Sequence, residues 1–339
     1  PLMVMLAGQP FINVRLSFHS YIPRSTSSII SEKLVNHWVN KLIEFPEFHD
    51  KIEFKVAITT YSFDFDEKVE QLIGEVLTDV EKVEFKEAHR KQTISLLEKK
   101  GIGSIDQALD SINTLNFKHE ELIKNGYQSK ISSLFLMIDD CIQMGTIPFS
   151  ILARHGFIAK TILTSLERCD IIKRGDISKI QSSIQTIAGD LVDDMKSLKI
   201  DELSIDHFMK KYGHLRPGTY DITSKRYDQM PIAMLSNNIA LNNPKQGVKT
   251  FRFSPEQQKK INKFLKKEGF IDLNAKSLLE YINKATIGRE YGKFVFTKTV
   301  SDVLKLIEIF AKKNGLSLEE VSHIPINSLL DVAKNSAEG

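Results

Sequence analysis

Residues 212–227 read Tyr-Gly-His-Leu-Arg-Pro-Gly-Thr-Tyr-Asp-Ile-Thr-Ser-Lys-Arg-Tyr and follow a segment with helical periodicity. This stretch cannot itself be a continuous helix, because Pro217 lacks a backbone donor and pushes the residue before it out of the α region. Gly213 and Gly218 permit a positive φ, which favours a bent backbone at both positions. The sequence therefore predicts an ordered loop over residues 212–228, shaped by its glycines and its proline.

The predicted loop carries side chains that suit an anionic ligand. Arg216 and Arg226 are ten residues apart, and their guanidinium groups could converge on a phosphate or a carboxylate through forked hydrogen bonds. His214 is the candidate catalytic residue, as a hydrogen-bonding or acid–base group, and Tyr220 is a candidate substrate contact. Asp221 suits an orienting role. The alternative is that Arg216 and Asp221 pair with each other only to hold the shape of the loop.

Length and composition limit the classes of protein that fit. The 339 residues can form one large or two medium domains. With 46 Lys and Arg against 43 Asp and Glu, the net charge is only +3, which gives no general electrostatic case for binding nucleic acid. Two cysteines, Cys141 and Cys169, fit a reducing cytoplasm. Without an uninterrupted apolar run of about 18 residues, we expect no membrane span.

The first 66 residues predict a small α+β unit. Residues 2–22 show partial alternation of apolar and polar side chains around a turn, which predicts two strands or a hairpin. A helix follows, capped by Ser27 or Ser28. Residues 52–65 are rich in β-branched and aromatic side chains and predict a further strand that pairs with the first ones.

From residue 67 to residue 339 the periodicity is mostly helical, so we predict a mostly α protein with a helical domain over that range. Gly145 and Pro148 predict that one helix ends and another begins between them. Residues 235–250 combine Ser, Asn, Pro and Gly without periodicity, which predicts a mobile connection.

Four more polar residues outside the loop are candidate substrate contacts. Arg15 and Ser17 would share the polar face of the first predicted strands, although plain solvent exposure explains them equally well. Arg154 and His155 fall in the first turns of a predicted helix, where a cation opposes the helix dipole. A nearby aspartate could pair with that arginine instead.

Arg289 and Lys293 are spaced i, i+4 on a predicted helix and could clamp an anion. Such a doublet can also be solvated. The sequence contains no glycine-rich phosphate loop and no nucleophile elbow. His207 and His214 are seven residues apart rather than at the usual metal-binding spacing, so we expect no metal site.

Residues 212–221, with Lys225-Arg226-Tyr227 and Pro231, resemble the Gly-His-Arg-Gly-Pro, Asp-Leu and Pro-Arg-Trp run of phosphoenolpyruvate-utilising enzymes. The group includes phosphoenolpyruvate synthase-like proteins, rifampicin phosphotransferase and proteins with a PEP/pyruvate-binding domain. Further resembling stretches spread over almost the whole chain: residues 8–15, 17–23, 46–54, 145–159 and 289–294.

The resemblance implies that this chain is the central, mostly helical substrate-handling region of a multidomain ATP-dependent phosphotransferase. An ATP-grasp module would precede it and a swivelling phosphohistidine module would follow it in the same polypeptide. ATP and Mg²⁺ are implied for the full-length protein, and no cofactor for this segment alone. The segment would position a small anionic or phosphorylated substrate and would be inactive in isolation. It lacks the phosphohistidine signature, because Val321-Ser322-His323-Ile324 has no glycines.

A second hypothesis assigns the chain no chemistry. A non-catalytic helical scaffold could dock the flanking modules, and its exposed cations would then face acidic surfaces of those modules. Neither hypothesis involves nucleic acid or a membrane, and both place the protein in the cytoplasm.

Overall fold

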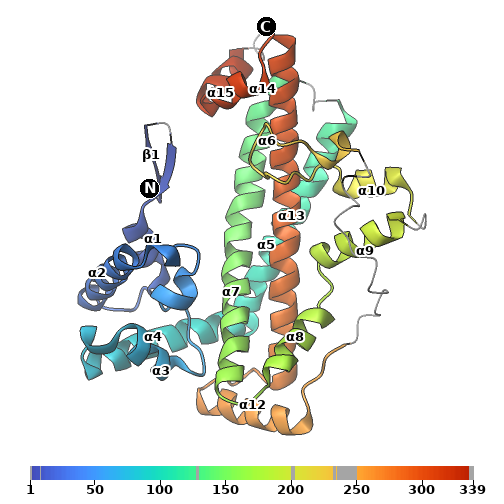
Figure 1. The fold of residues 1–339 in the computed structure, drawn as a ribbon. Coiled ribbons are helices and arrows are strands. Elements are labelled where there is room, and N and C mark those ends of the chain that lie inside the picture. The colour runs from blue at the N-terminus through green and yellow to red at the C-terminus, as the bar shows by residue number, and fades with distance from the viewer. Residues whose placement is uncertain are drawn as a thin grey trace. The chain divides into compact units, whose positions relative to one another are not determined.

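Helices make up most of the chain in the computed structural model, which describes residues 2–7, 9–126, 130–199, 203–231, 234 and 250–335 (Figure 1). The chain divides into two units. The first comprises Pro1–Gly103, Gly156–Gln181 and Phe251–Ile282, and the second comprises Ser104–His155, Ser182–Thr250 and Asn283–Gly339. The boundary predicted after residue 66 lies inside the first unit. The predicted mobile connection over 235–250 lies, apart from Thr250, outside the described residues.

The first unit contains the only strands in the described part of the chain, so the prediction of a mostly α protein is confirmed, with a small two-stranded sheet near the N-terminus. Its elements are β1 (Met3–Leu6), β2 (Gln9–Ile12), α1 (Val14–Tyr21), α2 (Ser28–Glu44), 3-10 turns at Pro46–Phe48 and Gly74–Val76, a π-helical turn at Ile52–Val56, α3 (Phe65–Leu72), α4 (Asp79–Leu97) and α12 (Pro255–Lys267). Four helices have residues in both units: α5 (Lys99–Lys124), α7 (Ile147–Arg168), α8 (Arg174–Ser183) and α13 (Ala275–Lys313).

Helix α2 packs through one apolar stripe. Ile30, Leu34 and Trp38, each about one turn apart, are at most 1 % exposed. The Trp38 ring meets the Phe18 ring edge-on, with centroids 5.9 Å apart. The predicted cap at Ser27 is confirmed, since its side chain accepts a hydrogen bond from the N–H of Ile30 at 3.4 Å.

The strand predicted across Arg15 is wrong. Strands β1 and β2 form an antiparallel hairpin in which Met3 faces Ile12, and the chain turns helical directly afterwards. Asn13 begins α1, because its side chain accepts a hydrogen bond from the N–H of Leu16 at 3.1 Å. This N-cap starts a helix where partial alternation predicts strand.

The strand predicted over residues 52–65 is also wrong. After the π-helical turn, residues 57–62 are buried but pair with no strand. The hydroxyl of Thr93 on α4 takes over part of this role: it accepts the N–H of Tyr61 at 3.1 Å and lies 3.0 Å from the Thr60 hydroxyl. Side chains of a helix thus satisfy a buried extended segment that its composition assigns to a sheet.

The second unit is helical throughout its described residues. Besides its shares of α5, α7, α8 and α13 it contains α6 (Leu134–Cys141), a π-helical turn at Ile142–Thr146, α9 (Ile187–Lys199), α10 (Ile205–Tyr212), α14 (Leu318–Ser322), α15 (Ile326–Asn335) and 3-10 turns at Ile131–Ser133 and Tyr227–Gln229. Within this unit α5, α7 and α13 lie side by side (Figure 1), and glycines let them approach closely. A Cβ on Gly292 of α13 would lie 2.8 Å from Leu152 on α7.

The helix break predicted between Gly145 and Pro148 is wrong. A π-helical turn joins α6 to α7 instead, with the N–H of Ile147 bonded to the carbonyl of Ile142. Proline cannot donate to the carbonyl four residues earlier and its ring crowds that position, so a wider turn before Pro148 accommodates it without ending the helix.

The helical run Ile131–Arg168 is long and apolar enough to cross a membrane, with a mean hydropathy of 1.3 in its most apolar window. In that window 28 % of the residues are buried. A long helix of a water-soluble protein passes the same test of length and composition, so the cytoplasmic location stays a prediction.

We predict that Gly145→Ala destabilises the second unit by about 1–3 kcal/mol, because the new Cβ would lie 2.9 Å from both Leu115 and Phe296. The matched control is Gly189→Ala on α9, where the nearest atom would be the Thr186 hydroxyl at 3.8 Å. The control should be neutral or stabilising by up to about 1 kcal/mol. Urea unfolding measures both, and equal effects would contradict this close packing.

Candidate functional site

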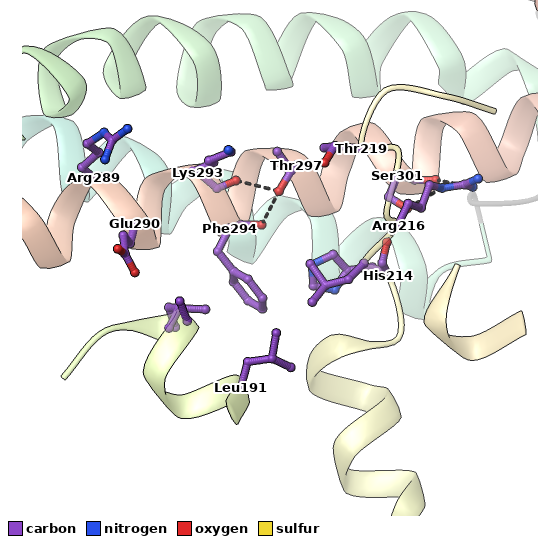
Figure 2. A pocket seen from close by; sticks show the side chains of 13 residues that line it. Leu191, His214, Arg216, Thr219, Arg289, Glu290, Lys293, Phe294, Thr297 and Ser301 are labelled. Carbon is purple, nitrogen blue, oxygen red and sulfur yellow. Dashed lines mark hydrogen bonds between the residues drawn. The ribbon is translucent and has the colours of Figure 1, made fainter. Parts of the chain in front are cut away.

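A pocket of about 340 Å³ lies in the second unit (Figure 2). One face of α13 forms its floor, with Arg289, Glu290, Lys293, Phe294, Thr297 and Ser301. Helix α9 contributes Ile187, Ala188 and Leu191, and the loop after α10 contributes His214, Leu215, Arg216 and Thr219. Four predicted site residues therefore meet here: His214, Arg216, Arg289 and Lys293.

The floor has two rows of side chains because α13 repeats about every 3.6 residues. Arg289, Lys293 and Thr297 follow one another at i, i+4 along one edge. Glu290 and Phe294 form the other row and point toward the side of Leu191 (Figure 2). The pocket thus offers cations at one edge of the floor, and a carboxylate with an apolar surface at the other.

The loop begins where α10 ends, and its two glycines allow neighbouring parts of the chain to pack closely against the backbone. Neither Gly213 nor Gly218 has a positive φ, so the reason inferred from sequence is wrong for both. A Cβ on Gly213 would lie 2.4 Å from the carbonyl oxygen of Met209, and one on Gly218 would lie 3.1 Å from the Cβ of Asp221. The loop is folded too tightly at both positions for a larger residue to fit without movement.

Arg216 holds the loop against α13. It is 7 % exposed, and its Nε donates to the Ser301 hydroxyl at 3.0 Å. Nη1 donates to the carbonyl of Ser224 at 2.6 Å, and longer contacts of 3.4 Å reach the carbonyls of Ile222 and Ser301. Burial, and then the charge of Arg226, lower the pKa of Arg216. No ion pair between Arg216 and Asp221 is found, so that alternative explanation of the loop is wrong.

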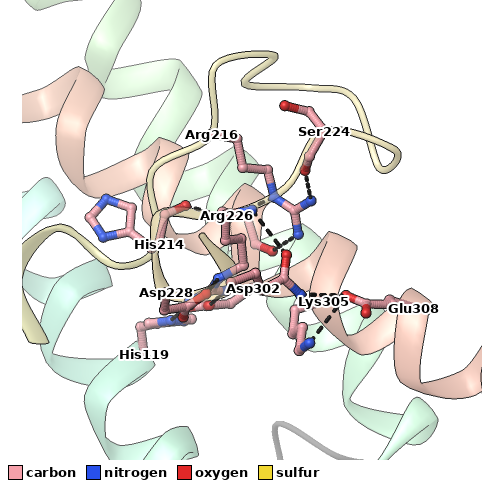
Figure 3. A network of polar contacts seen from close by, with 11 residues as sticks. His119, His214, Arg216, Ser224, Arg226, Asp228, Asp302, Lys305 and Glu308 are labelled. Atoms are coloured by element: carbon pink, nitrogen blue, oxygen red, sulfur yellow. Dashed lines mark hydrogen bonds and ion pairs between the residues drawn. The ribbon is translucent and has the colours of Figure 1, made fainter. Parts of the chain in front are cut away.

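Arg226 lies at the other end of the loop in a network of polar contacts (Figure 3), and it is absent from the pocket lining. It pairs with Asp228 at 2.9 Å and with Asp302 of α13. Asp302 also meets Nε2 of His119 on α5 at 2.7 Å. Burial opposes the charge of Asp302, but His119 and Arg226 outweigh it and lower its pKa to about 2. These ion pairs link the loop to α13, so the role of Arg226 is structural.

His214 lies in the pocket as a neutral imidazole at neutral pH. It is 4 % exposed, and burial lowers its pKa to about 4. Its ring meets Phe294 edge-on with centroids 4.8 Å apart, and its carbonyl oxygen accepts the Ser301 hydroxyl at 2.6 Å. Nε2 is buried without a hydrogen-bond partner among the described residues. An imidazole held in this way can exchange one hydrogen bond with a ligand.

Three predicted residues of the loop, Asp221, Tyr220 and Pro217, are absent from the pocket lining. Asp221 is exposed and accepts from the N–H and the hydroxyl of Thr223, at 2.8 and 2.7 Å, and these bonds lower the pKa of Asp221. It therefore shapes the turn, which fits an orienting residue. Tyr220 is 66 % exposed, and Pro217 is exposed as well.

Besides Arg226 and Tyr220, four predicted contacts lie outside this pocket. Arg15 and Ser17 belong to α1 in the first unit, where Arg15 donates to the side chain of Asn36 at 2.7 Å. Arg154 and His155 lie within α7 and do not line the pocket. His155 is buried with its Nε2 2.8 Å from the Ser104 hydroxyl, and burial lowers its pKa to about 4.

Sequence reasoning missed Glu290, Thr297, Ser301 and the apolar wall. The i, i+4 repeat of Arg289 and Lys293 continues to Thr297 and Ser301, and this polar stripe was a usable signal. No local pattern pointed to Leu191 or Ile187, which reach the pocket through tertiary packing. Among the described residues, no three His, Cys, Asp or Glu side chains gather as metal ligands.

We predict that Arg216→Ala destabilises the second unit by about 2–3 kcal/mol, because buried carbonyls and the Ser301 hydroxyl lose a charged donor. The control is Lys225→Ala, an exposed cation of the same loop. Thermal unfolding compares the two. An unchanged melting temperature for Arg216→Ala would show that its contacts hold nothing together and that its role is ligand binding alone.

We also predict that stability falls as pH drops from about 6.5 to about 4. Unfolded histidines take up protons in this window, whereas His214 and His155 stay neutral because burial lowers their pKa to about 4. The contribution of Asp302 is lost only between about pH 4 and pH 2, since its folded pKa is about 2. Urea unfolding at about pH 7 and about pH 4.5 measures the loss.

The double variant His214→Gln, His155→Gln should show a smaller difference between these two pH values than the wild type. Replacing the exposed His207 by Gln is the control and should leave the difference unchanged. An undiminished pH dependence in the double variant would contradict neutral, buried histidines.

Comparisons of the chain with protein-family models, with curated proteins and with solved structures found no match. The resemblance to phosphoenolpyruvate-utilising enzymes therefore stays a prediction from residues 212–231 and the other stretches that carry it.

Proposed function

We propose that the second unit binds a small organic anion in the pocket between α9, the loop and α13. The observation that carries this proposal is that cations outnumber carboxylates in the pocket lining. The lining contains three cations, Arg216, Arg289 and Lys293, and one carboxylate, Glu290, which makes +2 with His214 neutral. An anion with a phosphate or carboxylate group complements this charge.

Two of the cations differ in what they offer a ligand. Arg216 is held by a hydroxyl and carbonyl oxygens, so it keeps a full positive charge beside the pocket although its donors are occupied. Lys293 is exposed and has no ion-pair partner among the described residues, so its ammonium can contact the ligand directly. The first sets the potential of the pocket and the second supplies the donor.

Size and polarity agree with a small molecule. A volume of about 340 Å³ is at the lower end of the range of about 300–1,000 Å³ for ligand pockets. Phe294, Leu191 and Leu215 supply apolar contacts that would pack on a carbon skeleton. Inorganic phosphate alone would leave much of this surface wet.

We further propose that this pocket handles the substrate of a multidomain, ATP-dependent phosphotransferase of the phosphoenolpyruvate-utilising kind. The support is the residue pattern of the loop, since the His214 and Arg216 that carry the resemblance also line the pocket. ATP and Mg²⁺ would belong to flanking modules. Within this chain, Lys293 and Arg289 would neutralise charge on an anionic or phosphorylated substrate and His214 would hydrogen-bond to it.

One observation favours the alternative of a docking scaffold. In the first unit, the hairpin β1–β2 exposes Met3, Met5, Leu6, Phe11 and Ile12, each between 49 and 63 %. Exposed apolar side chains grouped on two unpaired strand edges are typical of a surface that contacts another protein. This would account for the first unit and leaves the cationic pocket of the second unit to the anion-binding proposal.

We predict that phosphoenolpyruvate binds the chain and that Lys293→Ala weakens it about ten-fold, because a charged hydrogen bond is lost. Lys225→Ala removes an equal charge outside the lining and should leave the dissociation constant unchanged. Isothermal calorimetry at low and high salt measures both. Absence of binding by phosphoenolpyruvate, by phosphate and by simple carboxylates would leave the scaffold as the function.

A further inference from the structure

Glu290 is the one acidic side chain in the pocket lining, and the protein gives it nothing to bind. Its Oε2 is buried without a hydrogen-bond partner among the described residues, and no ion pair of Glu290 is found there. Buried polar atoms are nearly always hydrogen-bonded, because an unmade bond costs the full desolvation of the group. An acceptor left open beside a cavity therefore points to a donor that arrives with a ligand.

Helix α13 explains why the cations of the floor do not satisfy this carboxylate. Arg289 and Lys293 lie on the neighbouring row, and Figure 2 shows both pointing to the opposite side of the helix from Glu290. The next residue on the row of Glu290 is Phe294, and its side chain has no hydrogen-bond donor for the carboxylate. The acceptor and the cations are thus separate contact points of one pocket.

His214 supplies a second open position. Its Nε2 is buried and unpartnered, and the side chain is 4 % exposed beside Phe294. The pocket therefore combines a cationic edge, an apolar strip and two polar atoms that the fold leaves unused. A ligand that carried only an anionic group would satisfy the cations and leave the acceptor of Glu290 dry and unpaired, which is unfavourable.

We infer that the ligand is an organic anion that also carries a hydroxyl or amino group, and that Glu290 selects it by accepting a hydrogen bond from that group. This inference rests on the proposed anion-binding function. The anionic group lies toward Lys293, the carbon skeleton packs on Phe294 and Leu191, and the hydroxyl or amino group donates to Oε2 of Glu290. Glu290 is a specificity-determining residue in this arrangement and takes part in no covalent step.

Three matched probes test the inference with the 339-residue chain: 3-phenylpropanoate, 3-phenyllactate and phenylalanine. They share a carboxylate and a phenyl group, and they differ in carrying hydrogen, hydroxyl or ammonium on the carbon next to the carboxylate. Calorimetry or titration by NMR should show the hydroxyl and ammonium probes binding about ten-fold more tightly than 3-phenylpropanoate, which is the usual gain from a hydrogen bond to a charged acceptor.

The variants separate selection from mere stability. Glu290→Leu should abolish the preference between the probes, with 3-phenylpropanoate binding at least as tightly as in the wild type because a negative charge leaves the lining. Glu290→Gln should keep a preference for the hydroxyl probe because its amide oxygen still accepts. Lys293→Ala should weaken all three probes alike. Equal affinities in the wild type, or a uniform loss for all probes in Glu290→Leu, would overturn the inference and leave the anion-binding function standing. Failure of every probe to bind would overturn both.

Discussion

The structure of the candidate site depends on a buried guanidinium that is held by oxygens other than carboxylates in the described part of the chain. Arg216 reaches from the loop to Ser301 on α13, and the same hydroxyl donates to the carbonyl of His214. One serine therefore bonds to both the Arg216 cation and the backbone of His214. Replacing a carboxylate by carbonyl oxygens satisfies the donors of Arg216 but leaves its charge in place, and that charge acts on whatever enters the cavity.

The two arginines of the loop thus have different roles. Arg226 is neutralised by Asp228 and Asp302, and the His119 contact extends this network to α5. Arg216 lines the cavity and forms no ion pair with any of the described residues. A buried cation such as Arg216 is tolerated only where its hydrogen bonds are held in place. The ion pairs of Arg226 make the other end of the loop rigid, and this helps to hold the hydrogen bonds of Arg216 in place.

The sequence predicted those parts of the fold and site that rest on local chemistry. Proline and glycine in residues 212–228 predicted a loop, and His214, Arg216, Arg289 and Lys293 were named before any contact between them was known. The strand predictions failed at Arg15 and over residues 52–65, where a cap and a helical threonine replaced sheet pairing. Alternation of apolar and polar residues in a short segment does not predict which distant residues the segment will contact.

The site predictions failed in a similar way. Arg15 and Ser17 belong to another unit, and Arg154 and His155 lie on α7 outside the lining, because the sequence gives the residue type but not the neighbour. Glu290 was not predicted as a site residue, because an acidic residue next to Arg289 and near Lys293 is typical of a surface charge pair. Only the burial of its Oε2 atom, and the direction of its row on α13, separate it from them.

The π-helical turn at Ile142–Thr146 limits which deletions the chain can accept during evolution. It holds one residue more than a regular turn, so the apolar faces on its two sides are in register only while that residue is present. Losing a single residue there would restore a regular helix and rotate everything beyond it by about 100°. Length in this short segment is therefore under tighter constraint than its side chains, the reverse of what is usual for a surface loop.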